Sequence, residues 1–411
     1  MTWDETFLPR LAQGHLEAVM ATQPVALLMG ARQVGKSTLV RRMPALADHR
    51  YLTLDGLATR EQAHRDPEGL IATGDRFVVD EVQRAPDLLL AIKASVDADR
   101  RPGRFVLTGS ANLLGMKKVT ETLAGRASYV TLWPMTRREH LGLGTAGCWS
   151  DLAAATVAEW PAILEAQTAP QEDWREAVSR SAYPPVALFN LSAEQQADWL
   201  QGYLDAFAVR DVAEWSQLSR PLDLVRLMRA MTAQLGQVEH QTTWNRLTGI
   251  PRSTVSRWAD LLEVMYQLVR LPAFSVNRTK RLTRSPKVYW SDTAMALHLA
   301  GRPTPTGHHL ENLILADLVA WCWAQSTRPT VHHWRTADQA EVDVVLELPS
   351  QRVLPIEVKA GRRPDWSEVT GLRAFLTEYP DLSIGGLVLH GGTDTYRLAA
   401  NIVAAPWWRV V

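Results

Sequence analysis

The sequence predicts an α/β protein of several domains, and three observations support this prediction. In the first 141 residues, short apolar runs of strand length alternate with segments of helical spacing. Residues 142–302 show mainly helical patterns and include a short basic segment. After the Gly- and Pro-rich stretch Gly301–Gly307, a second set of helix and strand patterns begins. A chain of 411 residues is long enough for about two to four domains.

The composition is that of an ordinary globular protein, with 46% hydrophobic and 21% charged residues. No apolar run reaches the roughly 18 residues needed to cross a bilayer. The best candidate, Leu313–Ala324, is interrupted by Asp317. The amino terminus lacks the basic and apolar regions of a secretion signal, and the two cysteines, Cys148 and Cys322, cannot build a disulfide framework. We therefore expect a cytoplasmic protein with no membrane partner.

The formal net charge is zero, but the charges are segregated along the chain. Asp151–Asp205 holds nine acidic and two basic residues, whereas Gln241–Trp290 holds nine basic and two acidic residues. The basic segment is a reason to look for an anionic partner, with an ordinary solvated face as the alternative.

Five strands are predicted in the first 141 residues. They lie at Val25–Met29, Tyr51–Leu54, Phe77–Val79, Phe105–Thr108 and Tyr129–Leu132. Helical segments, such as Ser37–Met43 and Leu88–Val96, lie between them. Strands that alternate with helices require crossover connections, so we expect a mostly parallel sheet.

A full match to the phosphate-binding pattern G-x-x-x-x-G-K-[ST] follows the first strand directly. The loop and the threonine after it comprise Gly30, Ala31, Arg32, Gln33, Val34, Gly35, Lys36, Ser37 and Thr38. The glycines let backbone N–H groups point at phosphates at the start of a helix. Lys36 would reach the β- and γ-phosphates, and the Ser37 hydroxyl would ligate Mg²⁺. We therefore expect ATP and Mg²⁺ as cofactors.

Further polar residues follow at the ends of the next strands. The third strand ends in Asp80 and Glu81. Asp80 is placed to hold the Mg²⁺ shell, and Glu81 to orient or deprotonate the attacking water. Ser110, just after the fourth strand, is placed to read the γ-phosphate. Arg126 precedes the fifth strand and would suit an arginine finger acting in trans, with a surface salt bridge as the alternative.

The motifs GARQVGKST, DEVQ, LTGS and LAGR together resemble those of bacterial AAA+-type ATPases that are similar to the archaeal-type ATPases. The resemblance extends over essentially the whole chain. It implies a P-loop ASCE/AAA+ core at residues 1–141 and a helical lid at residues 142–221. Arg210 in this lid is a candidate nucleotide contact, with a structural ion pair as the alternative. An arginine finger also requires a homo-oligomer, for which a ring is the usual geometry.

Residues 222–302 are predicted to form a winged helix-turn-helix. Gln241–Glu263 has the pattern of two helices joined by a tight turn, and the second helix leaves Arg252 and Arg257 open to solvent. Such a helix enters the major groove of DNA. The basic segment after it alternates as an exposed hairpin would. Its predicted DNA-contacting cations are Arg278, Lys280, Arg281, Arg284 and Lys287. A protein-contact or lid role is the alternative.

Residues 303–411 are predicted to form a second α/β domain. A helix carries Glu311, a second helix lies near Ser367–Tyr379, and strands are expected at Val331–Trp334, Val342–Leu348, Val353–Val358 and Ile384–Leu389.

Four residues of this domain form a candidate magnesium site. Glu357 and Lys359 are two residues apart on one strand and share a face, and Asp343 on the paired strand can lie beside them. The carboxylates would ligate Mg²⁺, Lys359 would help activate water, and Glu311 would complete the shell. This arrangement resembles the PD-(D/E)xK nucleases, which include archaeal Holliday-junction resolvases and many restriction enzymes. The resemblance implies a restriction-endonuclease-like fold, with a nuclease fold kept only for binding as the alternative.

The sequence therefore predicts an ATP-hydrolysing, DNA-processing protein with a Mg²⁺-dependent nuclease-like domain. Branched DNA, such as Holliday junctions or forks, is the expected partner, and helicase activity is expected of the motor. Two alternatives stay open. One is a nucleotide-gated switch, and the other is a regulatory or toxin–antitoxin-like component whose C-terminal domains only bind DNA or protein.

Overall fold

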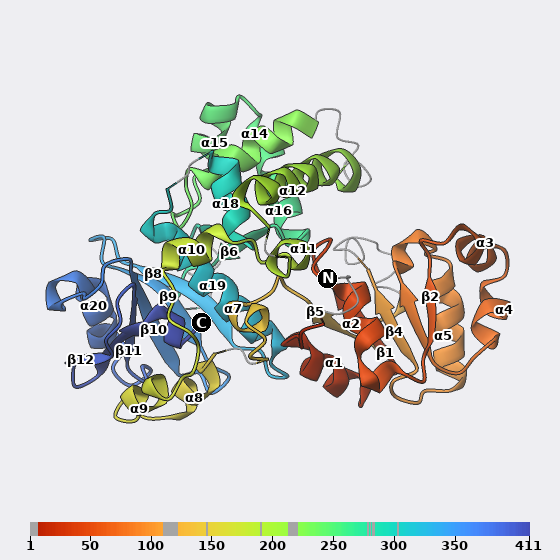
Figure 1. Cartoon of the computed structure of the whole chain (residues 1–411), viewed down its shortest axis with the longest axis horizontal. Helices are drawn as coiled ribbons and strands as arrows, with labels where there is room; N and C mark the ends of the chain where they lie inside the picture. The colour runs from red at the N-terminus through yellow and green to blue at the C-terminus, as the bar shows by residue number, and fades with distance from the viewer. Residues whose placement is uncertain are drawn as a thin grey trace. The chain divides into compact units, whose positions relative to one another are not determined.

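The computed structural model describes residues 7–109, 122–144, 147–189, 191–212, 221–277, 279, 281, 284–301 and 304–411, without the side chains of residues 210 and 211. The chain divides into two compact units (Figure 1). The first holds the chain up to Met135 with the short segments Val264–Tyr266 and Trp323–Ser326, and the second holds the remainder. Within the described ranges, no helix is both long and apolar enough to cross a membrane.

The first unit is built on a five-stranded sheet in which every strand pairs in parallel, in the order β2-β3-β4-β1-β5. The strands are β1 (Val25–Met29), β2 (Arg50–Thr53), β3 (Phe77–Asp80), β4 (Phe105–Thr108) and β5 (Ala127–Thr131). Its α-helices are α1 (Ala12–Met20), α2 (Lys36–Arg42), α3 (Leu57–Arg65), α4 (Pro67–Ala72) and α5 (Leu88–Ala98). The parallel sheet predicted for this part of the chain is confirmed.

Burial explains why these short runs become strands. Every residue of β1, β3 and β4 is buried, as expected for central strands of a parallel sheet that is covered on both faces. The outer strands β2 and β5 keep partly exposed positions. Because parallel strands end at the same edge, the loop after β1 and the carboxylates at the end of β3 meet there.

The second unit begins with a helical region, as predicted. Its helices are α7 (Arg137–His140), α8 (Trp149–Ala154), α9 (Trp160–Glu165), α10 (Trp174–Ser179), α11 (Pro184–Ala187), α12 (Ala193–Ala206), α14 (Pro221–Thr232), α15 (Gln241–Thr248) and α16 (Arg252–Val264). Several tryptophans of this region, among them Trp149, Trp160 and Trp244, are fully buried. They are core residues of this region.

An antiparallel pair of strands, β6 (Leu268–Leu271) and β7 (Lys287–Trp290), follows α16. The helices α18 (Thr293–Ala300) and α19 (Gly307–Ala324) come next.

The chain ends in a six-stranded mixed sheet of order β12-β13-β11-β10-β9-β8. Its strands are β8 (Thr330–Arg335), β9 (Glu341–Glu347), β10 (Val353–Lys359), β11 (Gly386–His390), β12 (Tyr396–Ala399) and β13 (Ile402–Pro406). The strands β8, β9 and β10 pair antiparallel, whereas β11 pairs in parallel with both β10 and β13. The helix α20 (Thr370–Glu378) lies between β10 and β11 in the chain.

The strands β12 and β13 were not predicted from the sequence; β13 pairs with β11, and β12 pairs with β13 at the edge of the sheet. Both are short, and the buried residues of β13 include the small Ala404 and Ala405, so neither strand stands out as an apolar run. The proposed boundaries at residues 141/142, 221/222 and 302/303 stay predictions.

Candidate functional site

The loop between β1 and α2 has the backbone shape that its glycines predict. Gly30, Gln33 and Gly35 have φ angles of 152°, 61° and 96°. A Cβ on Gly30 would lie only 2.1 Å from the carbonyl oxygen of Leu132, so no larger residue fits there. The helix α2 begins immediately after the loop at Lys36, which turns the first backbone N–H groups of the helix toward the loop.

Lys36 lies over this loop and is buried. Its Nζ donates hydrogen bonds to the carbonyl oxygens of Gly30 (3.0 Å) and Ala31 (2.8 Å). A phosphate bound in the loop would therefore meet an ammonium group that the loop itself positions.

Asp80, at the end of β3, is the centre of a hydrogen-bond network at this edge of the sheet. Its Oδ1 accepts from the Ser37 hydroxyl at 3.0 Å and also from the hydroxyl of Thr108, while its Oδ2 accepts from the Tyr51 hydroxyl at 2.6 Å. Asp80 is only 3% exposed. The donors come from α2, β4 and β2, so three elements hold one carboxylate.

The donor set suits a magnesium ion. The Ser37 hydroxyl and the Asp80 carboxylate are hard oxygen ligands that the structure places 3.0 Å apart. A magnesium ion bound there with a nucleotide would neutralise charge on the phosphates. The protein's own contribution is to hold these two oxygens beside the loop and its lysine.

Glu81 follows Asp80 in a left-handed backbone conformation, with φ of 59°. Its backbone N–H donates to the Thr108 hydroxyl at 3.3 Å, and its Oε2 accepts from Nε2 of Gln83 at 2.5 Å. Burial raises the pKa of the Glu81 carboxyl, although Lys36 opposes this shift. The carboxylate is thus held next to the loop, where a base for the attacking water is needed.

The other residues predicted for this site are placed as follows. Arg126 forms a bidentate ion pair with Asp97 of α5, in which Nε lies 2.6 Å from Oδ1 and Nη2 lies 2.9 Å from Oδ2. Its contacts are therefore those of the salt-bridge alternative, and a role in trans stays a proposal. Ser110 and the side chain of Arg210 lie outside the described part of the chain. Thr38 is exposed on α2.

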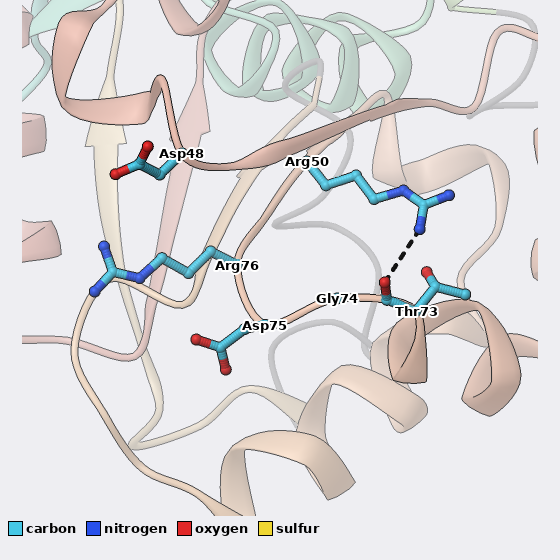
Figure 2. Close-up of a pocket in the computed structure, with 6 residues that line it drawn as sticks. All are labelled: Asp48, Arg50, Thr73, Gly74, Asp75 and Arg76. Carbon is cyan, nitrogen blue, oxygen red and sulfur yellow. Dashed lines mark hydrogen bonds between the residues drawn. The ribbon is translucent and has the colours of Figure 1, made fainter.

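A hollow of about 490 Å³ in the first unit lies away from the phosphate-binding loop. Figure 2 shows its lining of Asp48, Arg50, Thr73, Gly74, Asp75 and Arg76. Arg50 and Arg76 stand at the amino ends of β2 and β3, opposite the edge that carries Asp80. None of the predicted site residues lines this hollow, and its charges are of both signs.

The parallel sheet, the phosphate-binding loop and the Asp80 network define the class of this part of the protein: it is a P-loop ATPase domain. Residues 22–141 match a family model described as an AAA domain. The match and the site geometry support ATP hydrolysis by this domain, and a P-loop ATPase implies a nucleotide, usually with Mg²⁺. Residues 171–306 and 306–410 match two models that are described as domains of unknown function.

Two relatives of this chain have names that describe them as uncharacterized. The uncharacterized proteins Mb2031c of Mycobacterium bovis and Rv2008c of Mycobacterium tuberculosis are each 28% identical over 411 residues, covering 97% of this chain and 83% of theirs. Among solved structures, the Walker-type ATPase PABY2304 of Pyrococcus abyssi matches at 16% identity with a TM-score of 0.43, covering 72% of this chain and 99% of its own. A DNA replication initiation factor matches at 12% identity with a TM-score of 0.27, covering 62% and 86%.

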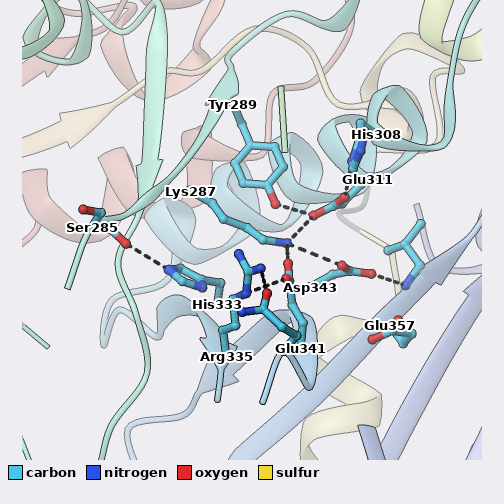
Figure 3. Close-up of polar contacts among 12 residues, drawn as sticks. Ser285, Lys287, Tyr289, His308, Glu311, His333, Arg335, Glu341, Asp343 and Glu357 are labelled. Atoms are coloured by element: carbon cyan, nitrogen blue, oxygen red, sulfur yellow. Dashed lines mark hydrogen bonds and ion pairs between the residues drawn. The ribbon is translucent and has the colours of Figure 1, made fainter. Parts of the chain in front are cut away.

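The second unit brings the residues of the candidate nuclease site together. Figure 3 shows Glu311 of α19, Asp343 of β9 and Glu357 of β10 near one another. Oδ2 of Asp343 accepts from the backbone N–H of Val358 at 2.9 Å, and Lys359 Nζ lies 2.8 Å from Oε1 of Glu357. Oε2 of Glu357 is buried and has no hydrogen-bond partner among the described residues.

Lys287 occupies the middle of this group, and its predicted place on an exposed hairpin is wrong. Its side chain is 2% exposed, and Nζ lies 2.5 Å from Oε1 of Glu341, 3.2 Å from Oε1 of Glu311 and 3.5 Å from Oδ1 of Asp343. The strand β7 turns this lysine inward, toward carboxylates from α19 and β9. A count of charges along the sequence cannot distinguish such a lysine from an exposed one.

Three further residues complete the group, and none of them was predicted from the sequence. Glu341 pairs with Lys287, the Tyr289 hydroxyl donates to Oε1 of Glu311, and Nδ1 of His308 lies 3.2 Å from Oε2 of Glu311. Tyr289 shares a face of β7 with Lys287, which is a period-two signal that could have linked them. We call Glu311, Glu341, Asp343 and Glu357 the acidic cluster.

Burial and mutual repulsion perturb the carboxyl groups of the acidic cluster. Burial raises the pKa of Glu357 to about 8, with the neighbouring Asp343 adding to the shift. Burial likewise raises the pKa of Asp343 to about 6. Burial acts in the same direction on Glu311, but the Lys287 ammonium group and the hydrogen bonds from His308 and Tyr289 together outweigh it and lower the pKa of that carboxyl.

As placed here, the acidic cluster does not fit a magnesium ion. Among the described residues, no three His, Cys, Asp or Glu side chains are arranged to hold a metal ion together. The Lys287 ammonium group instead neutralises the carboxylates from their midst.

The predicted DNA-contacting cations do not share one environment. Arg252, Arg257 and Arg284 are exposed. The guanidinium of Arg281 contacts both Glu347 oxygens, at 2.6 and 3.2 Å, and lies over the Phe274 ring, so it is engaged within the protein. Arg278 and Lys280 lie outside the described residues.

Proposed function

We propose that this protein couples ATP hydrolysis to the binding and remodelling of DNA. The observation that carries this proposal is the order of elements from α14 to β7. Three helices, α14, α15 and α16, are followed by the antiparallel pair β6 and β7, and Val238 between α14 and α15 forms a bridge to Lys287 of β7. This order supports the proposed winged helix, a unit that commonly binds DNA.

The helix pair α15 and α16 supports the DNA-binding proposal in detail. The helix α15 ends at Gly249, which has φ of 72°, and α16 begins three residues later at Arg252. The helix α16 buries Val255, Trp258, Ala259 and Leu262. Its opposite face leaves Arg252 and Arg257 exposed near the amino end, where the second helix of such a pair meets bases and phosphates.

For ATP turnover, we assign each step to residues of the first unit. The loop and Lys36 bind and orient the phosphates, and Ser37 and Asp80 would hold the magnesium ion. Glu81 would take the proton of the attacking water. Tyr51 and Thr108 keep the Asp80 carboxylate in place through their hydrogen bonds.

The second unit also has features of a nuclease-like domain. A helix with Glu311 precedes the antiparallel strands β8, β9 and β10, and α20 leads to β11, which is parallel to β10. This order supports the proposed PD-(D/E)xK-like fold. Because the Lys287 ammonium group pairs with carboxylates of the acidic cluster, we favour a domain that binds DNA without cutting it. Cleavage is the second candidate function.

Fluorescence anisotropy with a labelled four-way junction tests the DNA-binding proposal. We expect the double variant Arg252→Ala/Arg257→Ala to weaken binding and to flatten the slope of log K against log salt by about two, one for each lost phosphate contact. Arg65→Ala, at an exposed arginine of α3 in the first unit, is the matched control and should bind as the wild type does. Wild-type affinity and slope in the double variant would contradict the proposal.

Strand separation and cleavage assays on forked and four-way DNA distinguish the remaining alternatives. Strand separation that requires ATP and is lost in Lys36→Ala supports the motor. Cleavage that requires Mg²⁺ and is lost in Lys359→Ala establishes the second candidate. ATP turnover without any effect on DNA favours the nucleotide-gated switch, and preference for one linear duplex sequence favours the regulatory component.

A further inference from the structure

Lys287 is an unusual residue for a hairpin strand, because its charged group is buried among carboxylates. The side chains of Lys287 and Glu311 are 2% and 6% exposed, and that of Asp343 is 17% exposed. Charges so far from water are costly unless they are paired and hydrogen-bonded. An ammonium group has three N–H donors, and here three carboxylates surround it.

The partners of Lys287 come from separate elements. Glu341 and Asp343 lie on β9, and Glu311 lies on α19, whereas Lys287 itself belongs to β7. The ammonium group therefore neutralises the very carboxylates, Glu311 and Asp343, that the sequence assigned to a metal ion. The remaining carboxylate, Glu357, pairs with Lys359 through one oxygen, at 2.8 Å.

Glu357 keeps one carboxylate oxygen without a hydrogen-bond donor among the described residues. Its side chain is 9% exposed, and this oxygen, Oε2, is buried. Asp343 and Glu357 lie on paired strands, because Val344 pairs with Ile356. Without the Lys287 ammonium group, a divalent cation would satisfy this buried acceptor together with the neighbouring carboxylates.

We propose that Lys287 is the resident cation of the acidic cluster and that its ammonium group excludes a divalent cation from Glu311, Asp343 and Glu357. Removal of this one positive charge leaves a set of oxygen ligands with a net negative charge, which attracts a divalent cation. The inference rests on the proposed function in one respect, because it concerns the proposed nuclease-like domain. It holds whether or not that domain cuts DNA.

Mn²⁺ binding to the full-length, nucleotide-free protein tests the inference, with the electron paramagnetic resonance signal of free Mn²⁺ as the readout. We expect Lys287→Met to bind one more Mn²⁺ ion than the wild type. The affinity of the acidic cluster for Mn²⁺ should be at least about tenfold higher in the variant than in the wild type, because a positive charge within a few ångströms of the site is gone. Added Mn²⁺ should also raise the melting temperature of Lys287→Met more than that of the wild type.

Two lysine variants serve as matched controls. Lys287→Arg keeps the positive charge and should not gain the Mn²⁺ site. Lys359→Met removes the other lysine of the group but leaves Lys287 in place, so it should not gain the site either. An equal gain in Lys359→Met would show that any loss of positive charge suffices, which overturns the specific role of Lys287. No gain in a folded Lys287→Met would overturn the proposal as well.

Measurements in the wild-type background keep the proposal testable if Lys287→Met does not fold. With Lys287 in place, Glu311→Gln and Asp343→Asn should leave Mn²⁺ binding unchanged. A loss of Mn²⁺ binding in either variant would mean that the metal and Lys287 share the cluster, which contradicts exclusion. Failure of DNA cleavage in every variant bears on the proposed function alone, because none of these readouts depends on DNA.

Discussion

Asp80 shows how single hydroxyl groups organise the nucleotide site. Tyr51, Ser37 and Thr108 each donate a hydrogen bond to this carboxylate, and each comes from a different element. Several donors fix the orientation of a buried carboxylate. The ring of Tyr51 also lies under the guanidinium of Arg41, at 4.4 Å, which holds the phenol in place.

The neighbouring Glu81 gives the first prediction at the residue scale. Glu81→Gln keeps the size and the Gln83 contact but removes the base, so we expect ATP turnover to fall by about 10²-fold or more while nucleotide affinity stays near the wild-type value. Steady-state phosphate release and binding of a fluorescent ATP analogue measure the two quantities. Glu61→Gln, at an exposed position of α3, is the control. Unchanged turnover in Glu81→Gln would show that another group is the base.

At the scale of elements, α19 is a core helix with ionisable groups in its buried positions. Leu310, Ile314, Leu318 and Trp321 are buried along it, and so is Asp317. Oδ1 of Asp317 accepts from Nε1 of Trp149 at 2.9 Å, while Oδ2 is buried and has no hydrogen-bond partner among the described residues. A hydrogen bond thus offsets the loss of hydration at one oxygen of this carboxyl group but not at the other.

The titration of Asp317 gives a prediction for α19. Burial raises the pKa of this carboxyl to about 7, despite the opposing Trp149 hydrogen bond. In the unfolded chain an aspartic acid titrates near 4, so between about pH 4 and 7 the unfolded state loses a proton that the folded state keeps. The protonated Asp317 therefore contributes to the free energy of unfolding below about pH 4. This contribution is lost as the pH rises through about 7.

Asp317→Asn should remove this part of the pH dependence, because the amide keeps the acceptor for Trp149 and cannot ionise. We expect the free energy of unfolding of the wild type to fall with rising pH by on the order of 2–4 kcal/mol more than that of the variant. Urea unfolding followed by tryptophan fluorescence measures the difference, since most of the 16 tryptophans lie in the second unit. Asp381→Asn, at an exposed position, is the control. Parallel pH curves for wild type and Asp317→Asn would contradict the prediction.

At the scale of the whole molecule, the question is whether one subunit completes the site of another. Within one chain, Arg126 is held by Asp97 at 2.6 and 2.9 Å. This pair is solvent-accessible, with side-chain exposures of 24% and 45%, and such pairs exchange partners at little cost. An anionic phosphate on a neighbouring subunit would compete with Asp97 for the same guanidinium.

Mixing two inactive variants tests a role of Arg126 in trans. In a mixed oligomer of Arg126→Ala and Glu81→Gln, some sites combine an intact Glu81 with an intact Arg126 from the neighbour. We therefore expect ATP turnover of the mixture to exceed the sum of the separate variants several-fold. Lys36→Ala mixed with Glu81→Gln is the control, because both residues serve the same subunit's site and no recovery should occur. No recovery in the first mixture would place Arg126 outside the neighbour's site.

Features that depend on residues close together in the chain could be predicted from the sequence alone. The loop from Gly30 to Lys36 is one continuous segment, and its strand and helix adjoin it, so the motif predicted its geometry. The alternation along β10 likewise placed Glu357 and Lys359 together, at 2.8 Å. Such short-range features follow from backbone periodicity.

Contacts between side chains that are distant in the chain depend on how the strands and helices pack. Tyr51 reaches Asp80 because β2 lies next to β3, and strand order cannot be read from the strands themselves. Lys287 reaches Glu311, 24 residues away, and Asp343, 56 residues away, because β7 turns it inward. A basic residue has the same charge whether it is exposed or buried; the packing of β7, α19 and β9 makes this one an internal counter-ion.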